Sequence, residues 1–256
     1  MSALEIHLIP CLTDNYAYLL VDARTNCAAV VDPSEAAPVK AVIDQRRVTL
    51  THILNTHHHF DHTGGNLDLK AATGASIVGP ASDRARIPGI DLALGEDSDF
   101  SFAGHRAQIL DIPGHTSGHI AFWFKDSRAV FTGDTLFSLG CGRLFEGTPA
   151  QMWQSLSKLA QLPPETRIYC GHEYTESNAR FALTIDPHNA ELHQRAEDVR
   201  HLRARRLPTI PSTIGLERHT NPFLRAGDPA LQRALGMAGE HPVTVFAEIR
   251  RRKDNF

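Results

Sequence analysis

Histidine and aspartate crowd into one short segment of this 256-residue chain. Residues 56–66 read Thr-His-His-His-Phe-Asp-His-Thr-Gly-Gly-Asn. Four side chains there are nitrogen or oxygen donors of the kind that bind zinc, iron or manganese: His57, His59, Asp61 and His62. One ion could not easily use all four donors, whereas two neighbouring ions could share them. The segment therefore predicts a metal site, and we expect His58 to point away from the ions and to support the ligands.

Three further donors each follow an apolar strand pattern. In every case the apolar run ends in a glycine that directly precedes the donor, at Gly114-His115, Gly133-Asp134 and Gly171-His172. We expect each glycine to let the backbone turn sharply as it leaves the sheet, which places the donor on a loop at the strand's end. The ligands would then converge on one edge of the scaffold. Asp134 is the natural bridge, because a carboxylate has two oxygens that can each face a cation.

Other interpretations of these residues are weaker. A polyhistidine-like tract could bind metal without catalysis, but the embedded Asp61, the preceding strand and the Gly64-Gly65 pair argue against it. The remaining histidines stay unassigned, because a lone histidine at a strand end is more often a hydrogen-bonded structural residue than a ligand. A serine hydrolase is disfavoured, since Ser117 stands one residue late for a Gly-x-Ser-x-Gly elbow.

Two kinds of pattern divide the chain near residue 175. Before it, short β-branched runs alternate with helical patterns, and after it strands largely disappear. We expect an α/β catalytic domain over residues 1–175 and a smaller, mostly helical, substrate-binding domain over residues 176–256. The expected strands are 6–9, 17–21, 28–31, 50–54, 107–112, 120–124, 129–131 and 168–170, and the expected helices are 35–47, 67–73, 150–162, 179–183, 190–207, 229–237 and 243–252.

Composition sets broader limits. The sequence is 42% hydrophobic, enough for a sizeable core. It has neither a long apolar run nor a secretory signal pattern at its start, so we expect a cytoplasmic protein without membrane contact. The four cysteines form no Cys-x-x-Cys pair and are predicted to be mostly buried free thiols. A net charge of −3 argues against a nucleic-acid partner, and we expect a monomer.

The donors resemble those of the metallo-β-lactamase superfamily in type and order. The motif is His57-x-His59-x-Asp61-His62 followed by His115, Asp134 and His172. The resemblance implies a four-layered αββα sandwich that holds two divalent metal ions, with zinc expected first and iron or manganese as alternatives. One ion would bind His57, His59 and His115, and the other Asp61, His62 and His172. Asp134 and a water or hydroxide would be shared between them.

Within that superfamily the chain is similar to the glyoxalase II, or hydroxyacylglutathione hydrolase, family over essentially its whole length. The similarity rests on residues 9–16, 131–147, 170–175, 220–225 and 250–256. It implies glutathione contacts from Arg143, Tyr174, Arg250 and Lys253. Phe145 stands where some members have a tyrosine, which removes a hydroxyl contact. The basic run at the end leaves open whether Arg250 or Arg251 faces the ligand.

This resemblance implies a reaction. The thioester of an S-(2-hydroxyacyl)glutathione such as S-D-lactoylglutathione would be hydrolysed to glutathione and a 2-hydroxy acid (D-lactate), the second step of methylglyoxal detoxification. Two ions would lower the pKa of a shared water toward about 7, and Asp61 and Asp134 would orient the resulting hydroxide as it attacks the thioester carbonyl.

Three alternatives remain. A persulfide dioxygenase with a single iron is disfavoured by the loop that carries Arg143 and by the long helical C-terminus. A nucleic-acid-processing protein of this fold is disfavoured by the weak basic bias of residues 178–256, which contain 13 Lys and Arg against 9 Asp and Glu. A non-catalytic metal store would have no use for a glycine-rich loop with Arg143 beside Asp134.

Overall fold

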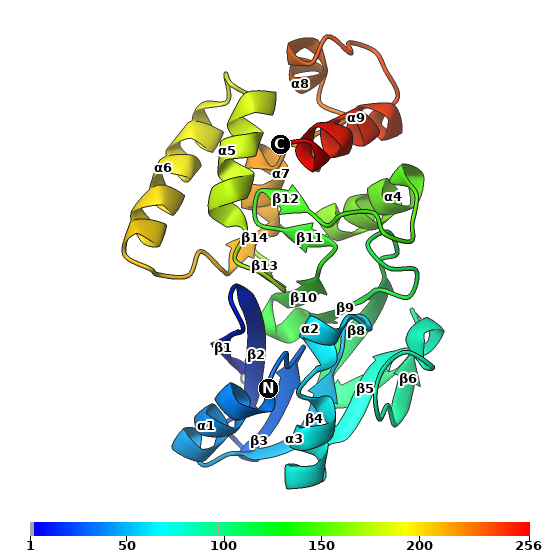
Figure 1. The fold of residues 1–256 in the computed structure, drawn as a ribbon, viewed down its shortest axis with the longest axis vertical. Helices are drawn as coiled ribbons and strands as arrows, with labels where there is room; N and C mark the ends of the chain where they lie inside the picture. The colour runs from blue at the N-terminus through cyan, green and yellow to red at the C-terminus, as the bar shows by residue number, and fades with distance from the viewer. Residues whose placement is uncertain (1–2, 97) are drawn as a thin grey trace. The chain divides into compact units, whose positions relative to one another are not determined.

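The computed structural model describes residues 3–96 and 98–256. The chain forms two compact units (Figure 1). The first unit comprises Met1–Asp111 and Ser117–Gly133, and the second comprises Ile112–Thr116 and Asp134–Phe256. The functional division expected at residue 175 stays a prediction.

The first unit begins with a mixed sheet whose strands are paired in sequence order. Its first three strands are antiparallel, and the third to the sixth run parallel. Parallel neighbours need a crossover, which α1 (Ala36–Arg46) supplies between the third and fourth strands and α3 (Asn66–Thr73) between the fourth and fifth. The strands are β1 (Glu5–Cys11), β2 (Asn15–Asp22), β3 (Cys27–Val31), β4 (Thr49–Leu54), β5 (Ser76–Pro80) and β6 (Leu92–Leu94).

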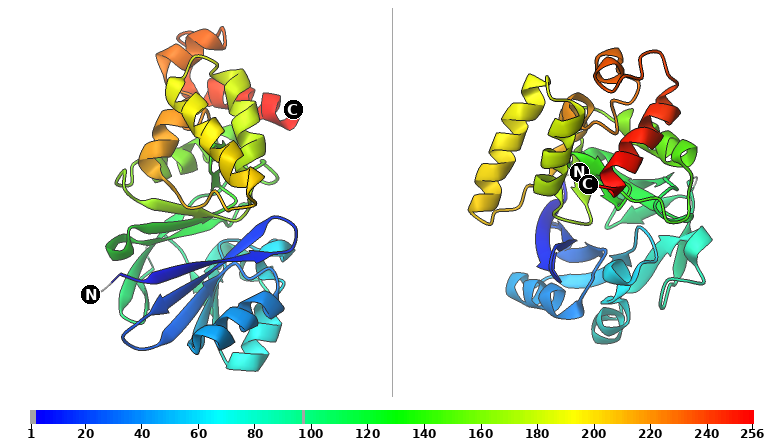
Figure 2. Two further views of the ribbon diagram at one scale, coloured as in Figure 1. Left: turned by 90° about the vertical axis from the view of Figure 1, so that its left-hand side faces the viewer. Right: turned by 45° about the horizontal axis from the view of Figure 1, so that its top comes forward.

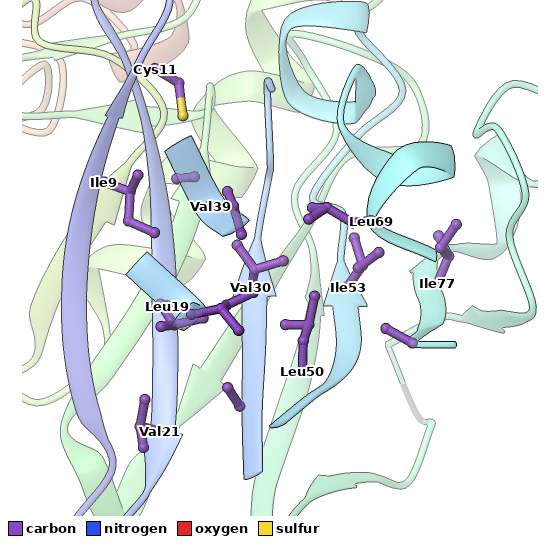
Figure 3. Packing of buried hydrophobic residues seen from close by; sticks show 14 of the residues in the cluster. Ile9, Cys11, Leu19, Val21, Val30, Val39, Leu50, Ile53, Leu69 and Ile77 are labelled. Carbon is purple, nitrogen blue, oxygen red and sulfur yellow. The ribbon is translucent and has the colours of Figure 1, made fainter. Parts of the chain in front are cut away.

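Both crossover helices cover the same face of this sheet (Figure 2). Figure 3 shows Val39 of α1 and Leu69 of α3 directed at strand residues such as Leu19, Val30 and Ile53. All five side chains belong to one buried apolar cluster. Burial of this face fixes the register of the strands, because a slip by one residue would turn every apolar side chain to the opposite face.

A second set of strands packs on the other face of the first sheet. The rings of Tyr18 and Phe131 lie 5.6 Å apart, and those of His52 and Phe102 lie 5.7 Å apart. Each strand of this set is antiparallel to the next. The strands are β7 (Phe100–Phe102), β8 (His105–Asp111), β9 (Ile120–Phe124) and β10 (Ala129–Gly133). The first unit therefore has one helical layer and two sheet layers.

The second unit is mostly helical. Its helices share an aromatic core in which the ring of Phe223 lies 6.0 Å from those of Phe181 and Phe246. Two short antiparallel pairs accompany them, β11 (Leu136–Phe137) with β12 (Gly140–Cys141) and β13 (Arg167–Cys170) with β14 (Ser212–Thr213). The helices are α4 (Pro149–Ala160), α5 (Thr175–Ile185), α6 (Ala190–Ala204), α7 (Ile214–Thr220), α8 (Pro229–Ala234) and α9 (Pro242–Asp254).

Each helix and strand expected from the sequence is present, with modest shifts at the ends. The helix expected at 179–183 is longer and begins at Thr175. The pattern missed the strands β5, β6, β7 and β14, the β11–β12 hairpin and the helices α2 (Phe60–Thr63) and α7. Strands of two or three residues are too short to show a clear period. Among the residues that the structure describes, no helix is long and apolar enough to cross a membrane.

Candidate metal centre

The ligand segment of the first unit follows β4. His57 and His59 lie on the connection after this strand, with Nε2 of His57 3.1 Å from Nδ1 of His59. Asp61 and His62 already belong to the short helix α2 (Phe60–Thr63), where Nε2 of His62 lies 3.6 Å from Oδ2 of Asp61. The chain therefore bends into a helix at Phe60, before the last two donors of the segment.

Asp32 supports this segment from the neighbouring strand. Since β3 and β4 are parallel, with Val31 opposite Leu54, the residues that follow them leave at the same edge of the sheet. Asp32 accepts hydrogen bonds from the backbone N–H of Thr56 (2.8 Å) and from its hydroxyl (2.6 Å). Nδ1 of His62 lies 3.1 Å from the same carboxylate. A carboxylate only accepts, so Nδ1 carries the proton and Nε2 offers its lone pair to a metal ion.

Sequence reasoning missed Asp32, although a signal existed. It is the first residue after a buried strand, as Asp134 is, and its φ of 48° is uncommon for a residue other than glycine. Asp32, His57 and His62 each place one ligand atom within 4.8 Å of the others. We regard Asp32 as a support for the ligands, because Thr56 and His62 already engage its oxygens.

His119 and His58 complete the surroundings of His57. The ring of His119 is stacked on that of His57, with centroids 4.5 Å apart, and its Nδ1 contacts the carbonyl of Ile120. Gly133 is required beside this stack, since its φ is +46° and a Cβ there would collide with Thr56 and His119. His58 turns to another partner, as expected, and its Nδ1 lies 2.9 Å from the fully buried Asp83. The stacking role of His119 was not predicted.

Asp61 is held by two polar side chains of the first unit. Nδ2 of Asn15 donates to its backbone carbonyl and to its Oδ2, both at 3.0 Å. The Ser34 hydroxyl also donates to its carbonyl. These bonds fix the direction of the carboxylate, which a ligand needs if it is to bind without a large loss of side-chain entropy.

The second unit brings the other three expected donors together. Nε2 of His115 and Nε2 of His172 lie 3.5 and 3.3 Å from Oδ2 of Asp134. The preceding Gly114 and Gly133 have positive φ angles of 151° and 46°, as expected. The backbone also bends at Gly171, directly before His172.

The donors of the second unit are also anchored through their far sides. Nδ1 of His115 donates to the carbonyl of Arg143 at 2.9 Å, which leaves Nε2 directed at Asp134. The ring of His172 is stacked on Tyr174, with centroids 4.7 Å apart and planes 3° apart. Gly142 passes so close to the Asp134 carbonyl that a Cβ would collide with it.

This chemistry fits divalent metal ions. Each unit presents histidine nitrogens and carboxylate oxygens between 3 and 4 Å apart, and imidazole with carboxylate is a usual donor set for zinc, iron and manganese. In both units the second atom of a histidine ring is fixed by a backbone carbonyl or a carboxylate. Such anchoring is typical of metal ligands.

A cluster of cations lies in the second unit. Burial, and then the nearby charges of Arg250, Arg180 and Arg143, lower the pKa of Lys253 to about 8. The Arg143 side chain is 67% exposed, whereas Arg250 is buried and donates from Nη1 to the Cys141 carbonyl at 2.9 Å. Asp254 contacts both arginines. Such a concentration of positive charge suits an anionic ligand.

The exposure and partners of individual side chains bear on the glutathione contacts that the resemblance implies. Arg251 is exposed and paired with Glu248, so Arg250 is the arginine of this run that faces residues 140–143. Arg180, exposed on α5, was not predicted from the sequence, which gave it no motif. Tyr174 is 39% exposed, and the 63% exposed ring of Phe145 lies 5.1 Å from that of His115.

Two family models match successive parts of the chain. Residues 13–172 match the metallo-beta-lactamase superfamily, and residues 173–256 match the hydroxyacylglutathione hydrolase C-terminus. The fold is thus that of the metallo-β-lactamase superfamily, which confirms the expected fold class. A solved structure, TTHA1623 in a di-iron-bound form, is similar with 28% identity and a TM-score of 0.60, over 84% of this chain and 98% of that one.

Full-length relatives define the family more narrowly. The hydroxyacylglutathione hydrolase of Methylococcus capsulatus is 56% identical over 99% of both chains. That of Rhodospirillum rubrum is 54% identical over the whole of both chains. This chain belongs to the hydroxyacylglutathione hydrolase family, as its motifs indicated.

Proposed function

We propose that this protein is a thioesterase that hydrolyses S-(2-hydroxyacyl)glutathione, such as S-D-lactoylglutathione, to glutathione and a 2-hydroxy acid. This is the second step of methylglyoxal detoxification. The observation that carries the proposal is the joint presence of anchored His/Asp donors and a cation cluster within one chain of this family. The family favours neither a mononuclear-iron dioxygenase nor a nucleic-acid-processing protein.

The seven donors are proposed to hold two divalent ions. His57, His59 and His115 would bind one ion, Asp61, His62 and His172 the other, and Asp134 would bridge them. The order of the donors in the family motif supports this assignment, as do the bonds that orient His62 and His115. Zinc is the first choice and iron or manganese the alternatives, because the metal supply decides among ions that accept the same donors.

When bound, such ions supply hydroxide at neutral pH and stabilise negative charge on oxygen. The chain's own residues orient the attack. Asp61, fixed by Asn15 and Ser34, presents a carboxylate that accepts a hydrogen bond from the attacking oxygen. Asp134 does the same from the second unit. Glutathione leaves as a thiolate, a fairly good leaving group that needs little acid catalysis.

Glutathione itself is proposed to bind at the cation cluster. Its two carboxylates would accept charge-assisted hydrogen bonds from Arg143, Arg250 and Lys253. Tyr174 would contact the ligand from its place on the His172 ring. Phe145 can offer only an apolar contact. The bond from Arg250 to Cys141 gives this arginine a second task, because it also holds the loop that leads to Arg143.

The remaining expectations concern the compartment, the oligomeric state and the partners of the protein. A cytoplasmic monomer without a nucleic-acid partner is proposed. Cys11, Cys141 and Cys170 are buried and Cys27 is partly buried, all as free thiols, which suits a reducing compartment. The expectation of mostly buried free cysteines is confirmed.

The deciding experiment combines metal analysis with a choice of substrates. Purified protein is assayed with S-D-lactoylglutathione, a β-lactam and glutathione persulfide, before and after chelation. Hydrolysis of the thioester alone, lost on chelation and restored by zinc, supports the proposal. Full activity after exhaustive chelation, or turnover of the persulfide with oxygen uptake, contradicts it.

A further inference from the structure

A buried polar cluster in the second unit is hydrogen-bonded to the β11–β12 hairpin. We define the Glu217 cluster as Glu217, Arg195, Asn221, Ser138, Ser212 and Thr220. Its central members are almost completely buried, with Glu217 and Asn221 at 0% exposure and Arg195 at 7%. They come from α6, α7 and the turn that follows α7. None of these residues belongs to the donors or to the cation cluster.

Glu217 joins the helices to the hairpin. Its Oε2 accepts the backbone N–H of Leu139 at 2.9 Å and Nδ2 of Asn221 at 3.0 Å. Its Oε1 accepts from Arg195 and from the Ser212 hydroxyl. Both carboxylate oxygens therefore have two donors each, so the buried charge is fully engaged.

Arg195 and Asn221 reach the same hairpin. Nη2 of Arg195 donates to the Ser138 hydroxyl at 2.9 Å. Nδ2 of Asn221 donates to the carbonyls of Phe137 (3.2 Å) and Gly140 (3.0 Å). The turn that these bonds hold is an unusual one, since Leu139 has a φ of 58° without being glycine. Such a conformation persists only where the surroundings enforce it.

The hairpin stands between the residues proposed to act on the substrate. It begins two residues after Asp134 and ends two residues before Arg143. The ring of Phe137 lies 5.4 Å from that of Tyr174. At the other strand, the Cys141 carbonyl accepts the hydrogen bond from Arg250. A shift of this hairpin would therefore move three of the four proposed glutathione contacts.

Stability alone is a weak reason for such a cluster. A buried ion pair can often be replaced by apolar residues of similar volume without loss of stability, whereas its hydrogen bonds fix a particular geometry. Here the cluster bonds to two carbonyls, one amide and one hydroxyl of a six-residue hairpin. What it fixes is the path of the hairpin.

We infer that Glu217, acting with Arg195 and Asn221, is a positioning residue for glutathione recognition. It sets the hairpin so that Arg143, Tyr174 and Arg250 meet the glutathionyl group. The inference rests on the proposed function for its substrate, but it concerns affinity for the glutathionyl group and not the hydrolytic step.

The test is Glu217→Gln. Glutamine has nearly the same volume, but its amide replaces one acceptor with a donor, so the bond to Leu139 or the bond to Arg195 is lost. KM for S-D-lactoylglutathione should rise about tenfold, the dissociation constant of glutathione measured by calorimetry should rise in parallel, and kcat should change by less than about threefold. Metal content should match that of the unaltered protein.

Asp186→Asn is the matched control. Asp186 lies in the same unit, and its side chain is bonded to Arg225 and Asn189, away from the hairpin. Both variants should lose thermal stability, but only Glu217→Gln should change KM. If Glu217→Gln fails to fold, the double variant Glu217→Leu/Arg195→Met, which leaves no buried charge unpaired, takes its place with the same expected result.

Equal KM changes in the two variants, or a KM and glutathione affinity within about twofold of the unaltered protein for the cluster variant, would overturn the inference. A protein that binds glutathione but hydrolyses no glutathione thioester would overturn the proposed function alone. The calorimetric affinities would then still test the role of Glu217.

Discussion

The two units supply the proposed metal donors in different ways. In the first unit, four donors stand within six residues, and their main support, Asp32, follows the adjacent parallel strand. In the second unit, His115, Asp134 and His172 come from three separate loops. Side chains far along the sequence, such as Glu217 and Asn221, hold the hairpin that follows Asp134.

The two units therefore differ in how far apart along the sequence the residues lie that bring their donors together. The first unit needs only a β-strand edge and a tight bend to bring its donors together, so a short motif nearly defines it. The second unit needs its helices to be folded before the hairpin has a fixed path. We therefore expect changes in the first unit to affect metal binding, and changes to the helices of the second unit to affect recognition of glutathione.

The largest effect is expected from Asp134→Ala. Removal of the proposed bridge should lower kcat/KM on the order of a thousandfold and lower the metal content at the same time, because both ions would lose a ligand. Metal analysis by mass spectrometry alongside steady-state kinetics checks this. A fully metallated and active variant would refute the bridging role.

Asp32→Asn should have the next largest effect. The change weakens the acceptor that fixes His62, and loss of such support costs roughly 10- to 100-fold in metal affinity or activity. Titration of zinc into the metal-free protein measures this affinity. Asp22→Asn is the control, since Asp22 is equally buried in the first unit but contacts Thr25 and His105. Equal zinc affinities in both variants would contradict the role of Asp32.

Arg143→Gln should weaken recognition of glutathione and leave the metal content unchanged. Loss of one charge-assisted contact should raise KM for S-D-lactoylglutathione about tenfold, with kcat and metal content nearly unchanged. Arg251→Gln removes an exposed arginine paired with Glu248 and should leave KM as it is. A lower metal content in Arg143→Gln would contradict the expectation that this arginine acts in glutathione recognition and not in metal binding.

Lys253 should give the substrate affinity a pH dependence. Burial and the neighbouring arginines lower its pKa to about 8, so the ammonium is present below that pH and lost above it. The attraction to a glutathione carboxylate is lost with it, and kcat/KM should fall severalfold as the pH rises through about 8. In Lys253→Gln this decline should be absent. A decline of the same size in the variant would assign it to another group.

The smallest expected effect is on cysteine reactivity. Burial raises the pKa of Cys11 and Cys141 to about 11 and that of Cys170 to about 12, so few thiolates exist at neutral pH. Iodoacetamide should modify Cys27 alone in the native protein and all four cysteines after unfolding. Mass spectrometry of the intact chain counts the adducts, and rapid native labelling of Cys141 would show that the hairpin opens.

The sequence by itself determined the family and most of the helices and strands, and it predicted the donors. Donor types and strand patterns are local properties, and motifs such as His57-x-His59-x-Asp61-His62 combine several of them within a few residues. The longer elements, such as α1 and β2, were predicted, whereas strands of two or three residues, such as β11 and β6, are too short to show a pattern and were missed.

Only the tertiary structure decided which residues support the donors. Asp32 gained its role because β3 and β4 are parallel neighbours, and His119 because its ring is stacked on His57. Glu217 and Leu139 are 78 positions apart, yet they share a hydrogen bond. No local pattern encodes such pairs, because contacts between distant segments exist only once the packed core fixes where each segment lies.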